Sequence, residues 1–330
     1  MNVGDNYNRP KVAQFLKDRD HGAKSSWKTW LYAGNPGVSE NYFVGYNYLM
    51  SKNVFSGPDA SREPDNPQET LEEKNFYYSG FCAAEMSCSV IKAVNHHPEG
   101  YYYAVDLTVS NADRSLLHEV NKTLMNGAGV ITPVKGAFNL SARGKRKVRI
   151  ALNFLEQYPI ITGDLANGRI KLLKRALAFL EEKRGRAVSQ EKHTEMSDIR
   201  DSLRRIKTKG IVEACRIVPA SNAAVGYFLS GVLDGEGSFG LKGGREPYLF
   251  VAMKDRKIIE LFREFVQYGK VRLRKDGLFH LEINRRSILE RVCAIFLTQY
   301  PLRHARQRER LQKLQRILND HTPRPLTKAA

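Results

Sequence analysis

The stretch Tyr227-Phe-Leu-Ser-Gly-Val-Leu-Asp-Gly-Glu-Gly-Ser-Phe239 decides the fold, because a weaker copy, Tyr77-Tyr-Ser-Gly-Phe-Cys-Ala-Ala-Glu-Met-Ser-Cys-Ser89, occurs earlier in the chain. Each stretch predicts a helix of apolar and small residues that ends on a glutamate, Glu85 or Glu236, and is followed at once by a strand. Two such helices in one chain indicate pseudo-two-fold symmetry. We expect one acid from each half to lie near the pseudo-two-fold axis.

The repetition extends well beyond these two stretches. Each half closes on a similar phrase, Phe154-Leu-Glu-Gln-Tyr-Pro-Ile160 in the first and Phe296-Leu-Thr-Gln-Tyr-Pro-Leu302 in the second. A phenylalanine in the preceding predicted hairpin, Phe138 or Phe279, lies 21 positions before the proline of the first phrase and 22 before that of the second. Internal repetition on this scale indicates duplication of a whole structural unit.

The pattern between these landmarks gives the order of elements in the first repeat. After the helix that ends at Glu85, it predicts strands at 87–94 and 101–110, a helix at 113–125, a hairpin at 130–143 and a helix at 145–158. Asp113 and Asp255 are predicted to begin helices, because aspartate accepts hydrogen bonds from free amides there. Another helix is predicted at 169–183. The fold class is therefore α+β.

These patterns divide the chain into five parts. They are an N-terminal extension at 1–70, the first repeat at 71–183, a charged linker at 184–221, the second repeat at 222–320, and a tail at 321–330 that we expect to be disordered. The extension is rich in turn residues and aromatics but poor in aliphatics. Its aromatics either pack onto the main body, which we favour, or form an arm that clamps nucleic acid.

The composition points to a polyanionic partner. Lys and Arg number 53 against 35 for Asp and Glu, giving a formal net charge of +18. Charge of this size favours nucleic acid, and less strongly an anionic membrane surface. No apolar run approaches the roughly 20 residues that span a bilayer, and the first residues lack the layout of a secretory signal. The four cysteines show no metal-binding spacing, so we expect free, packed thiols in an intracellular protein that is not secreted.

The two predicted helices that end in glutamate carry small residues on one side. These residues are Ser79, Gly80, Ala83, Ala84, Ser230, Gly231 and Gly235. Such faces let two helix backbones approach closely. Their C-terminal ends, already partly negative, would then bring Glu85 and Glu236 together, and the resulting repulsion would be relieved by a divalent cation such as Mg²⁺. Two metals about 4 Å apart can support phosphoryl transfer. The alternative is that either glutamate caps a turn or faces solvent.

The predicted hairpins supply a surface for recognition. Alternate residues of a strand point to the same face, so residues 270, 272 and 274 share one face and Val271 and Leu273 the other. We expect the nucleic-acid-binding side chains of the second repeat to be Ser238, Lys242, Lys270, Arg272, Arg274, His280, Glu282 and Asn284. In the first repeat we expect Ser87, Ser89, Lys92, Asn139, Ser141 and Arg143, beside the outward-facing Val130, Thr132 and Val134. Because the first set carries less charge, the two halves should read different sequences. The alternative is a plain solvated sheet face.

The motifs Leu229-Ser-Gly-Val-Leu-Asp-Gly-Glu-Gly237 and Tyr78-Ser-Gly-Phe-Cys-Ala-Ala-Glu-Met86 resemble those of the single-chain, two-motif LAGLIDADG homing endonucleases. The resemblance covers residues 76–318 and implies two αββαββα units whose strands form a saddle over a long DNA site. It implies that Glu85 and Glu236 bind Mg²⁺, helped by the carbonyls of Ala84 and Gly235. It further implies cleavage of both strands of double-stranded DNA by a monomer, usually at an intron-insertion site.

The chain departs from the family pattern in its first half. Met86 replaces the usual glycine after the acid, and Ala83 replaces an acidic or polar residue. Members often carry a lysine shortly after the Pro-Leu phrase; the matching positions here are Arg306 in the second half and Asp164 in the first. Arginine stays protonated, so Arg306 could only stabilise charge. One half of the active site is therefore expected to be weak, which would give nicking or a binding-only role.

Two classes of function remain open. The first is a site-specific DNA endonuclease that depends on Mg²⁺. The second is a protein on the same scaffold that binds DNA or RNA without cutting, such as a maturase acting on intron RNA. A membrane-surface role is disfavoured, because acids and aliphatics interrupt the basic charge of the last predicted helix.

Overall fold

The computed structural model describes residues 72–94, 101–182, 189–210, 213–215 and 217–320, all within one compact unit, Pro64–Ala330. The predicted N-terminal extension and tail lie outside these residues. No helix in the described ranges is both long and apolar enough to span a membrane. Cys82, Cys88, Cys215 and Cys293 are free, and all but Cys215 are buried, which confirms the prediction of unpaired thiols.

The first repeat has the predicted order of elements, with ends within one residue of the predicted ones. Its elements are α3 (Phe76–Glu85), β1 (Met86–Val94), β2 (Tyr101–Asn111), α4 (Arg114–Leu124), β3 (Val130–Val134), β4 (Ala137–Arg143) and α5 (Lys145–Gln157). The side chain of Asp113 accepts a hydrogen bond from the Leu116 amide, as expected of the residue that begins α4.

The second repeat follows the same order. Its elements are α8 (Asn222–Glu236), β5 (Gly237–Lys242), β6 (Glu246–Met253), α9 (Arg256–Val266), β7 (Val271–Leu273), β8 (Phe279–Ile283), α10 (Arg286–Ala294), the short π-helix η2 (Ile295–Gln299) and α11 (Ala305–Asp320). The strands form two antiparallel sheets of identical topology, β1-β2-β4-β3 (sheet 1) and β5-β6-β8-β7 (sheet 2). The shared order confirms the duplication, and the α+β fold class is as predicted.

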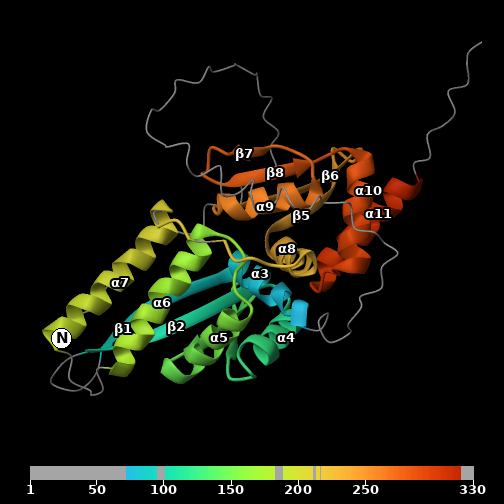
Figure 1. The fold of residues 1–330 in the computed structure, drawn as a ribbon. Coiled ribbons are helices and arrows are strands. Elements are labelled where there is room, and N and C mark those ends of the chain that lie inside the picture. The colour runs from blue at the N-terminus through green and yellow to red at the C-terminus, as the bar shows by residue number, and fades with distance from the viewer. Residues whose placement is uncertain (1–71, 95–100, 183–188, 211–212, 216, 321–330) are drawn as a thin grey trace, which may run out of the picture. The chain divides into compact units, whose positions relative to one another are not determined.

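Each sheet has one face packed against helices, which we call the covered face, and an opposite outer face. Helices α4, α5 and α6 (Asp164–Glu182) pack against sheet 1, and α9, α10 and α11 pack against sheet 2 (Figure 1). In β1 the buried Met86, Cys88 and Val90 alternate with Ser87 and Ser89, as the two-residue period of a strand requires.

The first repeat ends with a helix, α6, and a second helix, α7 (Gln190–Lys209), lies in the linker. Helix α6 begins five residues before the predicted start at 169, and α7 occupies most of the predicted linker. Helix α7 runs beside α6 and contacts the edge strand β1 (Figure 1). Its apolar side chains Met196, Ile199, Leu203 and Ile206 are buried at helical spacing.

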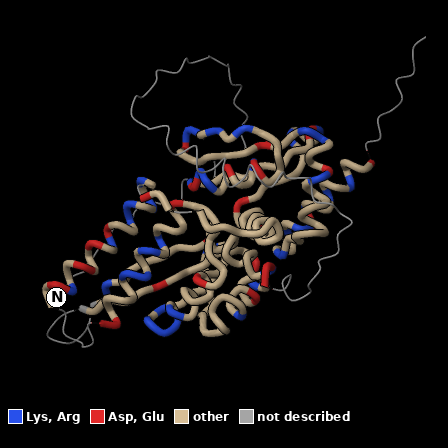
Figure 2. The backbone as a smooth tube through the Cα atoms, in the orientation of Figure 1, with Lys and Arg blue, Asp and Glu red and all other residues tan. Residues whose placement is uncertain are grey.

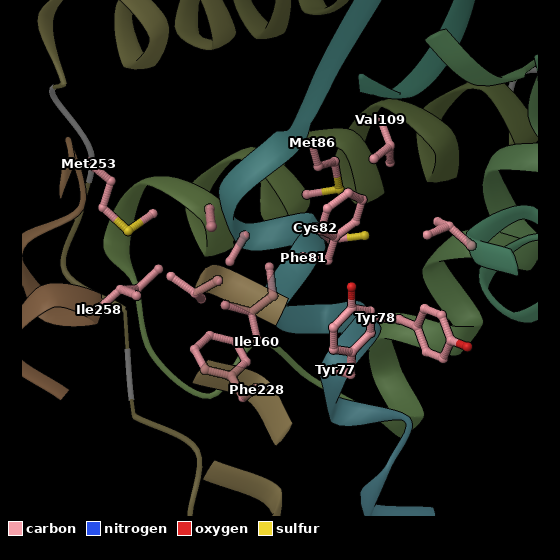
Figure 3. Close-up of a cluster of buried hydrophobic side chains, with 14 of the residues drawn as sticks. Tyr77, Tyr78, Phe81, Cys82, Met86, Val109, Ile160, Phe228, Met253 and Ile258 are labelled. Carbon is pink, nitrogen blue, oxygen red and sulfur yellow. The ribbon is translucent and has the colours of Figure 1, made fainter. Parts of the chain in front are cut away.

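A single hydrophobic core runs through both repeats. Figure 3 shows Phe81 of α3, Phe228 of α8 and Ile258 of α9 within one cluster of buried side chains. All three are fully buried. Burying a side chain of this size stabilises the fold by about 1.5–3 kcal/mol, so the core fixes the position of one repeat against the other.

Candidate active site and nucleic-acid interface

Helices α3 and α8 cross at the centre of this core in backbone contact. A Cβ atom added at Gly80 would lie 1.9 Å from the carbonyl oxygen of Phe228, and one added at Gly231 would lie 2.0 Å from that of Tyr77. Phe228 and Tyr77 hold equivalent places in the two motifs, so the contact is pseudo-symmetric. The predicted close approach is confirmed at these two glycines.

The C-terminal ends of the two helices bring Glu85 and Glu236 together. Each is the last residue of its helix, α3 or α8. A Cβ atom at Gly235 would lie 3.1 Å from Cγ and 3.5 Å from Oε1 of Glu85, so the Glu85 side chain lies against the last turn of α8, next to Glu236.

Both glutamates are partly buried, and both have raised pKa values. Burial and, after it, the negative charge of Glu236 raise the pKa of Glu85 to about 7, against an opposing hydrogen bond from Asn111. Burial raises the pKa of Glu236 to about 7. A pair of acids that titrate near neutrality is typical of a functional site.

The donor atoms at this point suit a hard divalent cation. The last carbonyls of a helix have no partner within it, and those of Ala84 and Gly235 belong to the last turns of α3 and α8. Carboxylate and carbonyl oxygens are the ligands that Mg²⁺ prefers. No group of three or more His, Cys, Asp or Glu in the described part of the chain could hold a metal ion. The glutamate pair would therefore share a cation with outside oxygens.

Asn111 is a neighbour of Glu85 that the sequence analysis missed. Its Nδ2 donates to Oε1 of Glu85 at 3.3 Å, and its Oδ1 accepts from the Asp113 amide at 2.8 Å. The sequence marks Asn111 only as part of the Asn-Ala-Asp start of α4, which hides this contact. Met253 precedes Asp255 as Asn111 precedes Asp113, and it cannot donate a hydrogen bond. The surroundings of the two glutamates therefore differ.

The first strand after each glutamate is held by the last helix of the same repeat, α6 or α11. Arg169 of α6 donates to the carbonyl oxygen of Met86 at 2.6 Å. Gln307 of α11 donates to that of Gly237 at 2.9 Å. These equivalent contacts fix the chain directly after each carboxylate, so the glutamates project from a rigid frame.

Asp234 joins the two repeats beside the site. It accepts hydrogen bonds from the Tyr77 hydroxyl at 2.7 Å and from the amides of Arg303 and His304 at 2.7 and 3.0 Å. Burial raises its pKa to about 6, opposed by these bonds. Its counterpart in the first repeat is the buried Ala83, so only the second motif provides such an acceptor.

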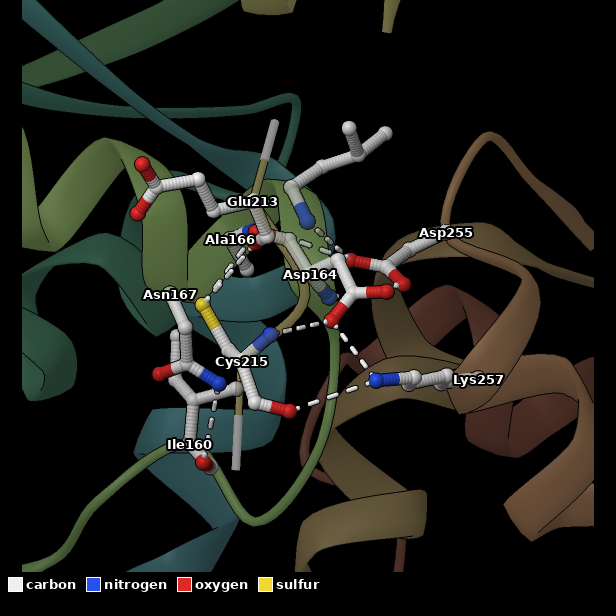
Figure 4. Close-up of polar contacts among 9 residues, drawn as sticks. Ile160, Asp164, Ala166, Asn167, Glu213, Cys215, Asp255 and Lys257 are labelled. Atoms are coloured by element: carbon white, nitrogen blue, oxygen red, sulfur yellow. Dashed lines mark hydrogen bonds and ion pairs between the residues drawn. The ribbon is translucent and has the colours of Figure 1, made fainter. Parts of the chain in front are cut away.

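The residues after the two Pro-Leu-type phrases have different roles. Arg306 is exposed in the first turn of α11, where its charge adds to burial in lowering the pKa of His304. Asp164 instead accepts from the Cys215 amide at 2.7 Å and pairs with Lys257 at 2.8 Å (Figure 4). It therefore ties the linker to α9.

Most of the nucleic-acid-binding residues predicted in the first repeat share the outer face of sheet 1. They lie directly across from one another, or from other residues of this face, in neighbouring strands. The pairs are Ser87–Thr108 and Ser89–Asp106 between β1 and β2, Ser110–Asn139, Thr108–Ser141 and Asp106–Arg143 between β2 and β4, and Val130–Ser141 and Thr132–Asn139 between β3 and β4. Lys92 is placed differently. It pairs with the buried Tyr103 on the covered face, because it lies an odd number of residues from Ser87 and Ser89. The predicted grouping of Lys92 with the two serines is wrong.

The second strand of sheet 1 adds residues that the sequence analysis left out. Thr108 Oγ1 lies 3.2 Å from Ser141 Oγ, and Ser110 donates to Asn139 Oδ1 at 2.8 Å. Arg143 pairs with the largely buried Asp106 at 3.5 Å. The strand itself was predicted, and its outward residues follow from its period alone.

The residues predicted in the second repeat gather on the outer face of sheet 2. Arg272 of β7 lies opposite His280 of β8. Phe250 of β6 lies between Glu282 of β8 on one side and Ser238 of β5 on the other, and Lys242 of β5 lies opposite Glu246 of β6. A pocket of about 160 Å³ at one edge is lined by Tyr268, Gly269, Lys270, Arg272, His280, Glu282 and Asn284. Five of the predicted residues therefore line one hollow.

Two details of sheet 2 differ from the sequence analysis. Leu273 was predicted on the face opposite Arg272, which helices cover elsewhere in the sheet, but it is 64% exposed at the last position of β7. Tyr248 and Phe250 lie on the outer face with their rings stacked, centroids 5.5 Å apart, and were not predicted as part of this surface.

The fold matches solved structures of DNA-bound nucleases. No protein-family model and no curated protein sequence matches the chain. I-SmaMI bound to an uncleaved DNA target in the presence of calcium ions matches with a TM-score of 0.63 and 19% identity, over 76% of this chain and 94% of that one.

Two further structures match equally broadly. The LAGLIDADG homing endonuclease I-GzeII in complex with its DNA target gives a TM-score of 0.60 at 17% identity, over 74% and 89% of the two chains. The LAGLIDADG homing endonuclease I-LtrWI bound to target DNA gives 0.61 at 17%, over 76% and 90%. The chain therefore has the two-unit α+β fold of the single-chain LAGLIDADG homing endonucleases, as the resemblance of its motifs implied.

Proposed function

We propose that this protein is a site-specific endonuclease that hydrolyses phosphodiester bonds of double-stranded DNA with the help of Mg²⁺. The observation that carries the proposal is the placement of Glu85 and Glu236 side by side at the joined ends of α3 and α8. The likeness to DNA-bound homing endonucleases supports the same reading. We propose a monomer, because one chain already supplies both halves of the site.

The two glutamates bind the cation through their negatively charged carboxylates. Ionised Glu85 and Glu236, together with the carbonyls of Ala84 and Gly235, form the protein side of the cation site. A bound divalent cation would supply a more acidic water and stabilise the charge on the leaving oxygen. The rigid helix pair holds the carboxylates in place beforehand, so little reorganisation is needed when DNA binds.

The two halves of the site are expected to act unequally. In the second half, Arg306 could stabilise negative charge near the reacting phosphate. In the first half the equivalent Asp164 carries the wrong charge and is already bound to Lys257 and the Cys215 amide. We therefore propose that the two DNA strands are cut at different rates.

The outer faces of the sheets are proposed to contact a long, asymmetric DNA site. Phosphate contacts would position the duplex, and base contacts would select its sequence. On sheet 2 we propose base contacts by Arg272, His280 and Glu282, which line one pocket. Ser87, Asn139 and Ser141 have the same role on sheet 1.

The test is a strand-resolved cleavage assay with Mg²⁺ on a target selected from randomised DNA. Glu236→Gln should abolish cutting of at least one strand and leave DNA affinity within about threefold, because the amide keeps its shape but loses its charge. Glu85→Gln should slow at least one strand. The control is Glu182→Gln, which removes an exposed carboxylate at the end of α6. Full cleavage of both strands by a variant that combines Glu85→Gln with Glu236→Gln would overturn the proposal. Specific binding of DNA or folded intron RNA without cleavage by the unaltered protein would point to the non-cleaving alternative.

A further inference from the structure

The outer faces of the two sheets differ in their chemistry. Sheet 2 and its turns carry basic residues at Lys242, Arg245, Lys270, Arg272, Arg274 and Lys275, and acids at Glu246, Asp276 and Glu282. The outer face of sheet 1 is mostly neutral, and strands β1 and β2 are almost free of charged residues in Figure 2, whereas β7 and its flanks are basic.

The charge that the strands of sheet 1 carry on the outer face is paired. Arg143 lies 3.5 Å from the carboxylate of Asp106, directly opposite in the register. The edge strand β3 instead presents apolar side chains, Val130 at 50% exposure and Val134 at 43%. If this strand faces a bound duplex, contact between the exposed valines and the methyl groups of thymine would remove apolar surface from water and so favour binding.

Asn139 lies in the same region of sheet 1. Its Oδ1 accepts from Ser110 at 2.8 Å, which fixes the side chain and leaves its amide hydrogens for an outside acceptor. Thr132 stands directly opposite Asn139 and is exposed. This part of the face therefore offers one amide, the hydroxyls of Thr132 and Ser141, and several methyl groups.

On sheet 2 the side chain best placed to contact a base is Arg272. It lies in the middle of β7, opposite His280, and lines the pocket at the sheet edge. Among the described residues it forms no ion pair, whereas Arg274 pairs with Asp276 at 2.7 Å. Arg272 is therefore the basic group of this strand that is available to an outside partner.

The two sets of groups fit different base pairs. In the major groove arginine pairs with the O6 and N7 of guanine, asparagine pairs with adenine, and apolar side chains contact the thymine methyl. We propose that the target has two unlike halves: an A·T-rich half read by Asn139, Val130 and Val134, and a half with a guanine at the base pair that Arg272 contacts. The inference rests on the proposed function, since it requires DNA on these faces.

The test begins with binding selection from a randomised duplex by the full chain with Ca²⁺ in place of Mg²⁺. The selected site should be A·T-rich on one side of its centre and contain a required guanine on the other. Replacing thymine by deoxyuridine removes only the methyl group, which should weaken binding about fourfold per contacted base in the A·T-rich half. Replacing the required guanine by 7-deazaguanine should weaken binding in the other half only.

Variants assign each half to its sheet. Arg272→Ala should weaken binding about 5- to 100-fold and remove the guanine preference, leaving the A·T-rich half unchanged. Val130→Ala with Val134→Ala should abolish the deoxyuridine effect and leave the guanine preference. Arg204→Ala, on the exposed side of α7, is the control and should change neither profile.

The outcomes distinguish failure of the proposed two-part target from failure of the proposed endonuclease function. Selected and cleaved DNA whose halves have the same composition would overturn the inference and leave the nuclease standing. So would methyl sensitivity and the Arg272 effect in the same half. Binding without any sequence preference would overturn both.

Discussion

At the scale of single residues, the glutamate pair should make stability depend on pH. Both Glu85 and Glu236 have pKa values of about 7, against an ordinary value of 4.5. A carboxyl group whose pKa is raised by folding stabilises the folded state while it is protonated. This contribution is complete below the unfolded-state pKa and is lost as pH rises through the folded-state value.

We predict that the metal-free protein loses about 2–4 kcal/mol of unfolding free energy between pH 5 and pH 8 through this pair, since one pKa unit is worth about 1.4 kcal/mol. Glu85→Gln with Glu236→Gln should remove most of this slope and stabilise the protein at pH 8. Denaturant unfolding in EDTA at several pH values measures the effect. Glu182→Gln should keep the slope, and adding Mg²⁺ at pH 8 should restore stability to the unaltered protein and to this control but not to the double variant. A slope that survives in the double variant would contradict the prediction.

The two glutamates could be found from the sequence, because each stands at a fixed place in a repeated motif. Asn111 could not. Its contact with Glu85 joins residues 26 positions apart, at the end of β2 and the end of α3. Its identity fits a helix start equally well. A residue with an adequate local explanation gives no sequence signal for a second, tertiary role.

At the scale of elements, the contact between α3 and α8 depends on two glycines. A Cβ at Gly80 would meet the Phe228 backbone, which cannot move without shifting the whole helix. We predict that Gly80→Ala or Gly231→Ala lowers the unfolding free energy by at least about 3 kcal/mol. Gly136→Ala is the control. Nothing lies within 4 Å of its Cβ position, and its φ of +76° should cost only about 1–2 kcal/mol. Equal losses at Gly80 and Gly136, measured by denaturant unfolding, would mean that the helices are not in tight contact.

Element order and most strand faces followed from periodicity, and the errors have local causes. Lys92 was placed by its charge, although the two-residue period puts it on the covered face with Tyr103. Leu273 was placed by its period, but the strand ends there and the side chain is exposed. Helix α6 was predicted to start too late, because the group that caps its first amides belongs to the other repeat. Periodicity describes one element at a time and cannot include such partners.

At the scale of the whole molecule, each repeat caps a helix of the other. Asp255 precedes α9, but its side chain does not cap that helix. Its carboxylate instead accepts from the first amides of α6, at 3.1 Å from Asp164 and 2.8 Å from Leu165. Asp113, which caps α4, also accepts from the Ala305 amide at the start of α11 at 3.2 Å. The exchange follows the pseudo-two-fold axis. Together with the shared core it joins the described repeats into one structure.

We predict that the two repeats unfold together. Asp255→Ala removes the acceptor for the buried amides that begin α6, which should cost about 2 kcal/mol. Because the repeats share one core, the loss should appear equally in both rather than in the first repeat alone.

Native-state hydrogen exchange on the variant measures this, with amides of β2 reporting on sheet 1 and amides of β6 reporting on sheet 2. Asp201→Ala, which removes an exposed carboxylate from α7, should change neither set by more than a few tenths of a kcal/mol. If β2 loses protection while β6 keeps it, the repeats are separate folding units. The glutamates at their junction would then be held by α3 and α8 alone, and the rigidity that the proposed active site requires would have to come from those two helices.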